Sequence, residues 1–172
     1  MPKVIFYVAA TLDGFIARMD GRVDFLERYE KGDIDTGFNA FFSTIDTVVM
    51  GSKTYLQSLG FGFWAYGTTP VHVFTKKTLP TPNNTVHLNS GNPKELLATL
   101  PGKRVWLVGG SLLAASFLKE GLIDEIILTV APLLIGNGIP LFNKTYSEEP
   151  FILDHMTSIA DLVQTTYKVR KT

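Results

Sequence analysis

Residues 105–113 read Val-Trp-Leu-Val-Gly-Gly-Ser-Leu-Leu: an apolar run, a glycine pair and the start of a second apolar segment. A short apolar run of this kind is typical of a strand that is covered on both faces. We therefore predict a strand over Arg104–Val108 and a helix over Leu112–Lys119, which ends at Gly121. A strand that leads through glycines into a helix is typical of a parallel α/β sheet.

Short apolar runs alternate with helical patterns on both sides of this segment in the chain. Further strands are predicted at Val4–Ala10, Thr47–Met50, Val71–Phe74, Thr85–Leu88 and Ile126–Val130. Between them, helices are predicted at Phe38–Ile45, at Thr54–Leu59 and from Pro93 through Leu100. Near the carboxyl terminus, Phe151–Met156 and Leu162–Val169 have no helix between them and are expected to form an antiparallel hairpin at the sheet edge. The pattern predicts one α/β domain over residues 1–172, with a mostly parallel sheet.

Composition excludes several classes of protein. The 172 residues carry 16 basic and 16 acidic side chains, so the formal net charge is zero, and neither nucleic acid nor an anionic membrane is an expected partner. No apolar run approaches the roughly 20 residues of a membrane span. Cysteine is absent, which excludes disulfides and thiolate sites and fits the cytoplasmic location that we expect. The histidines, His72, His87 and His155, lack metal-ligand spacing, and no metal is expected.

Three predicted strands end in residues that suit an anionic ligand. Arg104–Val108 is followed by Gly109-Gly110, Thr47–Met50 by Gly51-Ser52-Lys53-Thr54, and Val71–Phe74 by Thr75-Lys76-Lys77. Glycines let a phosphate approach the backbone, and a helix N-terminus favours negative charge. Ligands of open α/β sheets bind outside the carboxyl ends of strands. Each motif also has a structural interpretation: a tight turn, a Ser52 or Thr54 helix cap, or a solvated lysine turn.

Four segments in chain order carry a resemblance that spans essentially the whole chain. They are 11–17 (TLDGFIA), 49–55 (VMGSKTY), 108–112 (VGGSL) and 124–142 (DEIILTVAPLLIGNGIPLF). With these, the sequence resembles the dihydrofolate reductase superfamily, and most closely the C-terminal reductase domain of the bifunctional riboflavin-biosynthesis deaminase/reductase. The resemblance implies a three-layer, dihydrofolate-reductase-like α/β fold. It also implies an NADPH-dependent oxidoreductase that acts on a small-molecule substrate, and a homodimer.

The resemblance also implies positions for the cofactor. The residues that match the nicotinamide side of the pocket are Ala9, Ile16 and Ala17. Those that match the pyrophosphate and 2′-phosphate side are Gly51, Ser52, Lys53, Thr54, Thr75, Lys76 and Lys77. Those that match the glycine turn and helix start under the phosphates are Gly109, Gly110, Ser111 and Leu112.

Asp35 falls where folate reductases carry their active-site carboxylate, and we interpret it as the catalytic residue that binds the substrate and relays a proton. Its structural alternative is an N-cap of the helix that follows, and Asp33 and Asp24 are rival carboxylates. Asp13, in contrast, is interpreted as a turn former.

The expected substrate is of the 5-amino-6-(5-phosphoribosylamino)uracil type, which makes riboflavin biosynthesis the expected setting. The segment 19–24 (MDGRVD) lacks the Pro-Trp of folate reductases, and no arginine stands near Thr69 to hold a folate tail. A dihydrofolate or pterin reductase is therefore the alternative, and a non-catalytic nucleotide-binding module is a second one. We also expect association through the carboxyl-terminal third, because 126–135 is richer in apolar residues than one sheet face needs.

Overall fold

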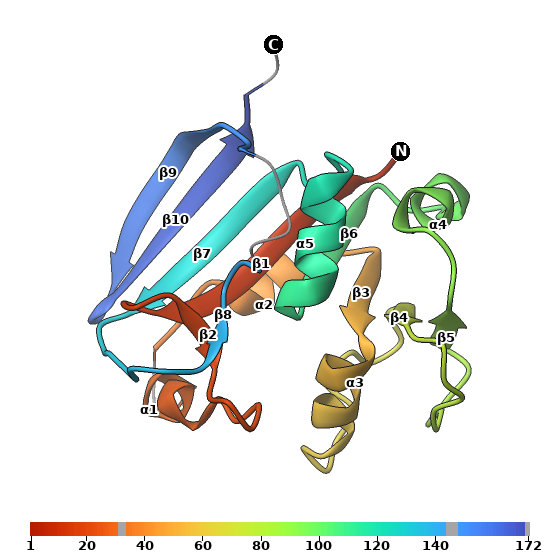
Figure 1. Ribbon diagram of the computed structural model, residues 1–172, viewed down its shortest axis with the longest axis horizontal. Helices are drawn as coiled ribbons and strands as arrows, with labels where there is room; N and C mark the ends of the chain where they lie inside the picture. Colours follow the sequence, from red (N-terminus) through yellow and green to blue (C-terminus); the bar gives the residue numbers. More distant parts are fainter. Residues whose placement is uncertain (31–33, 144–147, 171–172) are drawn as a thin grey trace.

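A central sheet organises the computed structural model, which describes residues 1–30, 34–143 and 148–170. Its order is β5-β4-β3-β6-β1-β7-β10-β9, and the six strands from β5 to β7 run parallel (Figure 1). The predicted mostly parallel α/β fold is confirmed. The strand bounds are β1 Lys3–Thr11, β3 Thr47–Gly51, β4 Val71–Phe74, β5 Val86–Asn89, β6 Arg104–Gly109, β7 Glu125–Ala131, β9 Phe151–Ile159 and β10 Leu162–Val169.

Helices cover both faces of the sheet and give three layers. On one face, α2 (Phe38–Phe42) and α3 (Ser52–Leu59) pack over a core that includes Tyr55 and Trp106. On the other face, α4 (Pro93–Thr99) and α5 (Ser111–Lys119) pack over a core that includes Phe6 and Phe117. In Figure 1, α5 lies in front of β1 and β6, and α2 lies behind them.

The apolar strands follow from this double cover. Along β1, Val4 and Phe6 enter one core, whereas Ile5 and Tyr7 enter the other. Successive side chains of a strand point to opposite faces, so a strand covered on both sides needs apolar residues at nearly every position. This explains why short continuous apolar runs identified the parallel strands.

The helix ends match the sequence signals in two cases. Gly121 has a φ of +62° and ends α5, where Leu122 N donates to Phe117 O at 2.9 Å in the usual glycine C-terminal motif. Asn92 caps α4 by accepting from Lys94 N at 2.7 Å, with Pro93 at the first helical position.

One predicted helix boundary and two alternative structural interpretations were wrong. The N-cap of α3 is Gly51, and no side chain caps it, so neither Ser52 nor Thr54 has the capping role. The helix α2 ends at Phe42 rather than at Ile45, although Ile45 remains buried. Gly37 is the N-cap of α2, which removes the interpretation of Asp35 as that cap.

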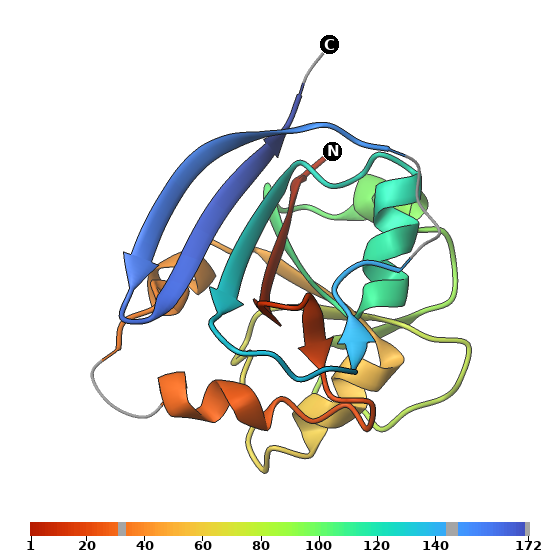
Figure 2. The same cartoon turned by 60° about the vertical axis from the view of Figure 1, so that its left-hand side comes forward.

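The carboxyl-terminal hairpin is confirmed. β9 and β10 are antiparallel, and their pairing extends from Phe151 opposite Val169 to Ile159 opposite Leu162. β10 also pairs antiparallel with β7. β9 is longer than predicted and forms the outer edge of the sheet, as Figure 2 shows.

Four short elements lie where the parallel strands end. They are β2 (Phe15–Ala17), β8 (Ile139–Pro140), the 3-10 helix η1 (Asp24–Leu26) and α1 (Glu27–Glu30), and β2 pairs with β8 in a separate two-stranded sheet. Both views place β2, β8 and α1 beyond the carboxyl end of β1 (Figures 1 and 2). No described helix combines the length and apolar character that crossing a bilayer requires.

Candidate functional site

Two glycine turns meet at the carboxyl ends of β3 and β6. A Cβ built on Gly51 would lie 3.7 Å from Gly109 O and 3.8 Å from Gly110 N, and one on Gly110 would lie 3.6 Å from Thr54 Oγ1. Gly109 has a φ of +110°, and the peptide bond between Gly109 and Gly110 is cis. The first turns of α3 and α5 begin directly after these glycines. The turns therefore form a backbone cradle between two helix N-termini, an arrangement that suits an anion.

The residues that line the predicted nicotinamide side belong to β1 and β2. Ala9 is partly exposed near the end of β1 and lies beside Thr129 of β7 in the sheet register. Ile16 packs against the core beneath α4 and α5, and Ala17 is buried. The structure thus brings all three to the same end of the sheet as the glycine cradle, although Ala17 is covered by neighbouring protein atoms.

The helix starts and lysines of the predicted phosphate side also lie at this edge. Ser111 is buried in the first turn of α5, whereas the Leu112 side chain beside it is exposed. Lys53, in the first turn of α3, and the pair Lys76 and Lys77 after β4 are exposed. The ends of β3 and β4 are adjacent, since Gly51 pairs with Phe74.

Thr75 shapes the turn that carries two of these lysines. Its Oγ1 accepts from Lys77 N at 3.0 Å, and its backbone N–H donates to Asn89 O at 2.8 Å. The lysine turn is therefore fixed at the end of β4 by local hydrogen bonds.

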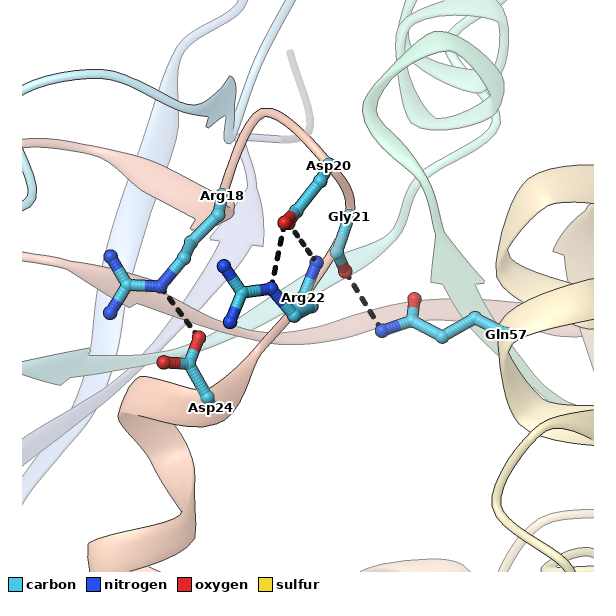
Figure 3. Close-up of polar contacts among 6 residues, drawn as sticks. All are labelled: Arg18, Asp20, Gly21, Arg22, Asp24 and Gln57. Atoms are coloured by element: carbon cyan, nitrogen blue, oxygen red, sulfur yellow. Dashed lines mark hydrogen bonds and ion pairs between the residues drawn. The ribbon is translucent and has the colours of Figure 1, made fainter.

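The loop after β2 is a folded, ion-paired segment, as Figure 3 shows. Arg18 Nε donates to Asp24 Oδ1 at 2.6 Å, and Arg22 Nε donates to Asp20 Oδ2 at 2.7 Å. Gln57 of α3 donates to Gly21 O at 2.9 Å and so joins the loop to the helix next to the cradle. The hydrogen bond from Arg18 lowers the pKa of Asp24. A carboxyl held ionised in this way is a poor proton donor, which weakens Asp24 as a candidate acid.

Asp35 precedes α2 on the other side of this edge. Its side chain is exposed, and its Oδ1 accepts from Gly37 N at 2.8 Å. The bond leaves the carboxylate with further acceptor capacity. The rival Asp33 lies outside the described residues.

A polar cluster on the sheet was missed by the sequence analysis. Gln164 Nε2 of β10 lies 3.2 Å from Tyr7 Oη, 3.0 Å from Thr129 Oγ1 and 3.3 Å from Thr36 O, next to Asp35. Burial raises the pKa of Tyr7 above 10.0, and the charge of Asp35 raises it further. The one signal in the sequence is Thr129, a polar residue inside the apolar run 126–130 and buried in the structure.

Other features of the described residues lie elsewhere. A surface groove of about 840 Å³ is lined by Pro2, Leu97, Ile123 and Ile152, at the amino ends of the strands. His72 and His87 stack with ring centroids 4.9 Å apart on β4 and β5. No group of three or more metal-ligating side chains occurs in residues 1–30, 34–143 and 148–170.

The sequence model of the RibD C-terminal domain family matches residues 2–165. The chain belongs to the RibD C-terminal domain family. Two uncharacterized proteins from Bacillus subtilis (strain 168) are relatives. YwjB is 34% identical, and the match covers 96% of this chain and 97% of YwjB. YyaP is 31% identical, and the match covers 81% of this chain and 80% of YyaP.

Solved structures agree with this family membership. A Shewanella sp. PV-4 protein, provisionally named as a riboflavin biosynthesis protein, has a TM-score of 0.89 and 32% identity and matches over 99% of this chain and all of its own. The Thermotoga maritima diaminohydroxyphosphoribosylaminopyrimidine deaminase/5-amino-6-(5-phosphoribosylamino)uracil reductase has a TM-score of 0.75 and 16% identity over 98% of this chain and 57% of its own. The second likeness shows a shared fold.

Proposed function

We propose that this chain is an NADPH-dependent reductase of a small heterocyclic substrate, most specifically of the 5-amino-6-(5-phosphoribosylamino)uracil type. The observation that carries the proposal is the glycine cradle: Gly51, Gly109 and Gly110 approach one another between two helix N-termini. Membership of the RibD C-terminal domain family supports the reductase class, and the named reaction of the Thermotoga maritima relative supports the substrate type.

The cradle fits the phosphates of a dinucleotide. Backbone N–H groups and the helix dipoles of α3 and α5 supply positive potential there without a bulky side chain in the way. Lys53, Lys76 and Lys77 lie on adjacent segments at the same edge, where a 2′-phosphate would meet positive charge. Bound in this place, NADPH would supply the hydride and leave as NADP⁺.

The chain's own residues supply orientation and the proton. Ala9 leaves space for the flat nicotinamide ring at the end of β1, because its side chain is a single methyl group. Asp35 accepts from donor groups on the substrate and relays the proton that accompanies the hydride. With one hydride and one proton added, the ribosyl group of the substrate becomes a ribityl chain.

Cofactor choice and turnover test the proposal. The purified chain is titrated with NADPH and NADH by fluorescence quenching, and NADPH oxidation is followed with 5-amino-6-(5-phosphoribosylamino)uracil or dihydrofolate. A hydrogen bond to a charged group is worth about 1.5–3 kcal/mol, so two lysine contacts predict a preference for NADPH of roughly 10²-fold after solvent screening.

Three outcomes contradict parts of the proposal. Equal affinities for NADPH and NADH would remove the 2′-phosphate role of the lysines. Turnover of dihydrofolate alone would replace the substrate type. Tight NADPH binding with no oxidation by either compound would favour a non-catalytic nucleotide-binding module.

A further inference from the structure

The polar cluster at Gln164 lies beside Ala9, on the side of the pocket where the nicotinamide ring is expected. In the sheet register, Ala9 of β1 pairs with Thr129 of β7, and Thr129 pairs with Gln164 of β10. Paired residues on neighbouring strands point to the same face and lie about 5 Å apart. Thr129 and Gln164 are therefore the next two side chains beside Ala9 on the face that α2 covers.

The orientation of the Gln164 amide follows from its partners. Thr36 O is a backbone carbonyl and can only accept, so the side-chain NH₂ must face the cluster. The same nitrogen lies within hydrogen-bond distance of Tyr7 Oη and Thr129 Oγ1. The nitrogen end of the amide therefore faces these three oxygens, and the oxygen end points away from them. Among the described residues, nothing donates to Gln164 Oε1.

Packing and charge define what this cluster can bind. The Tyr7 ring stacks on Phe41 with centroids 4.5 Å apart, which holds its hydroxyl against Gln164. The Asp35 carboxylate contributes negative charge to the surroundings of that hydroxyl. An N–H or amino group would find an acceptor in Gln164 Oε1, and Asp35 stands directly before Thr36, whose carbonyl the amide contacts.

We propose that Gln164 is a substrate-recognition residue, whose Oε1 accepts from an N–H or amino group of an uncharged planar heterocycle bound beside Ala9. Tyr7 and Thr129 are positioning residues that hold the amide in this orientation. The proposal rests on the proposed function, because that function places the nicotinamide, and with it the substrate, beside Ala9. It adds that the site selects a ring whose edge carries an N–H or amino group.

The test separates heterocycle binding from cofactor binding. Affinities for 5-amino-6-(5-phosphoribosylamino)uracil and for 7,8-dihydropterin are measured by calorimetry, on the free full-length chain and on the chain saturated with NADP⁺. NADPH affinity is measured separately by fluorescence. The variants are Gln164→Leu, Tyr7→Phe and Thr129→Val, and each is checked for an unchanged urea-unfolding midpoint.

The expected result is selective. The comparison uses whichever of the two heterocycles the wild type binds more tightly. Gln164→Leu lowers the affinity for it by about tenfold, the effect of one lost hydrogen bond, and leaves NADPH affinity within about twofold of wild type. Tyr7→Phe keeps the stacking on Phe41 and lowers the affinity for the same heterocycle by a smaller factor. The matched control is Thr166→Val, on the same strand and face but paired with Ile127, which leaves both affinities unchanged. If Gln164→Leu fails to fold, Gln164→Asn and Tyr7→Phe provide the same comparison.

Two results overturn the inference. One is a heterocycle affinity that stays within about twofold of wild type in both the Gln164 and Tyr7 variants. The other is a wild-type chain that binds neither heterocycle. A wild-type chain that does not bind NADPH contradicts the proposed function instead. An affinity of the free chain for the heterocycle that depends on Gln164 would still support the recognition role.

Discussion

Asp13 and Gly136 lie 123 residues apart in the chain and are joined by a hydrogen bond of 2.8 Å, from Gly136 N to Asp13 Oδ2. The same oxygen accepts from Ile135 N at 3.1 Å, and Thr11 Oγ1 donates to Asp13 Oδ1 at 2.6 Å. The carboxylate therefore ties the turn after β1 to the loop between β7 and β8. Two of the segments that carried the family resemblance, 11–17 and 124–142, are thus coupled physically through Asp13.

Asp13→Asn is expected to lower stability at neutral pH. The hydrogen bond from Thr11 is the main cause that lowers the pKa of Asp13 below 3.8, and the N–H groups of Gly136 and Ile135 add to it. A carboxyl with a depressed pKa in the folded state contributes stability that is present above its unfolded pKa and is lost as the pH falls through the folded one. Urea unfolding at pH 7 and at stepwise lower pH below about 4 measures the difference.

The control for this experiment is Asp161→Asn, in the exposed turn between β9 and β10. The gap between wild type and Asp13→Asn should narrow as the pH falls below about 4, while the control stays close to wild type throughout. A gap that is constant across this range would show that the charge of Asp13 does not stabilise the two loops.

Gly51→Ala is expected to separate cofactor binding from folding. Gly51 has an ordinary φ of −83°, and its added Cβ would meet neighbours no closer than 3.7 Å, so the fold should tolerate alanine. A methyl group in the cradle would nevertheless hold a phosphate away from the backbone N–H groups. We expect NADPH affinity to fall by about tenfold or more, equivalent to one charge-assisted hydrogen bond, with little change in the melting temperature.

Two further glycine variants serve as controls. Gly91 lies in the loop before α4, where a Cβ would meet only Glu95 at 3.8 Å, so Gly91→Ala should change neither the NADPH affinity nor the melting temperature. Gly109→Ala places a side chain at a φ of +110° and should destabilise the fold itself. NADPH affinity that is unchanged in Gly51→Ala would contradict the cradle as the phosphate site.

The sequence analysis found the parallel strands because their double cover leaves apolar residues at nearly every position, as in Val4–Ala10. It missed the β2–β8 pair, since two- and three-residue strands carry no periodic pattern, and Phe15 pairs with Pro140 from a distant part of the chain. A Ser52 or Thr54 cap was the structural alternative that residue type offered for this motif, yet Gly51 is the N-cap and no side chain caps α3.

The polar cluster was hidden for a related reason. Tyr7, Thr129 and Gln164 meet through the registers of β1, β7 and β10, and a register between distant strands cannot be read from either strand alone. The residues of the glycine turns, in contrast, each stand directly after a strand that the sequence identifies, so their convergence at one edge follows from the parallel topology.

We propose that two copies of the chain pair through the β9–β10 hairpin of the carboxyl-terminal third. β7 lies between β1 and β10 with Ile126 buried, whereas Leu153, Met156 and Val163 are exposed. The register places these three on the same face of the hairpin, and a contiguous exposed apolar face usually marks a contact. Sedimentation at micromolar concentration should give a dimer, and Leu153→Glu with Met156→Glu should shift it to monomer.

Ile152→Glu is the matched control, because Ile152 is exposed on the same strand but pairs with Lys168 on the opposite face. It should leave the dimer intact. A wild-type species of 19.0 kDa, or dissociation by the control alone, would contradict pairing through this face.

Asp35→Asn is expected to spare NADPH binding and to reduce turnover. The carboxylate stands before α2, on the side of the sheet edge where Gln164 reaches Thr36 O, and away from the glycine cradle at Gly51 and Gly109. Removing its charge should therefore leave the anionic end of the cofactor undisturbed. Asparagine keeps an oxygen that can accept from Gly37 N, as Asp35 does at 2.8 Å, so the local turn should persist.

The proton relay is what the substitution removes. A positioned acid or base typically contributes about 10²–10⁴-fold to the rate, and kcat/KM for 5-amino-6-(5-phosphoribosylamino)uracil should fall by a factor in that range. Asp24→Asn is the comparison: it breaks the ion pair with Arg18 at the same sheet edge without touching the α2 turn. If Asp35→Asn costs less than about threefold, its carboxylate only shapes the turn before α2, and the proton must come from another group, with Asp33 the first to substitute.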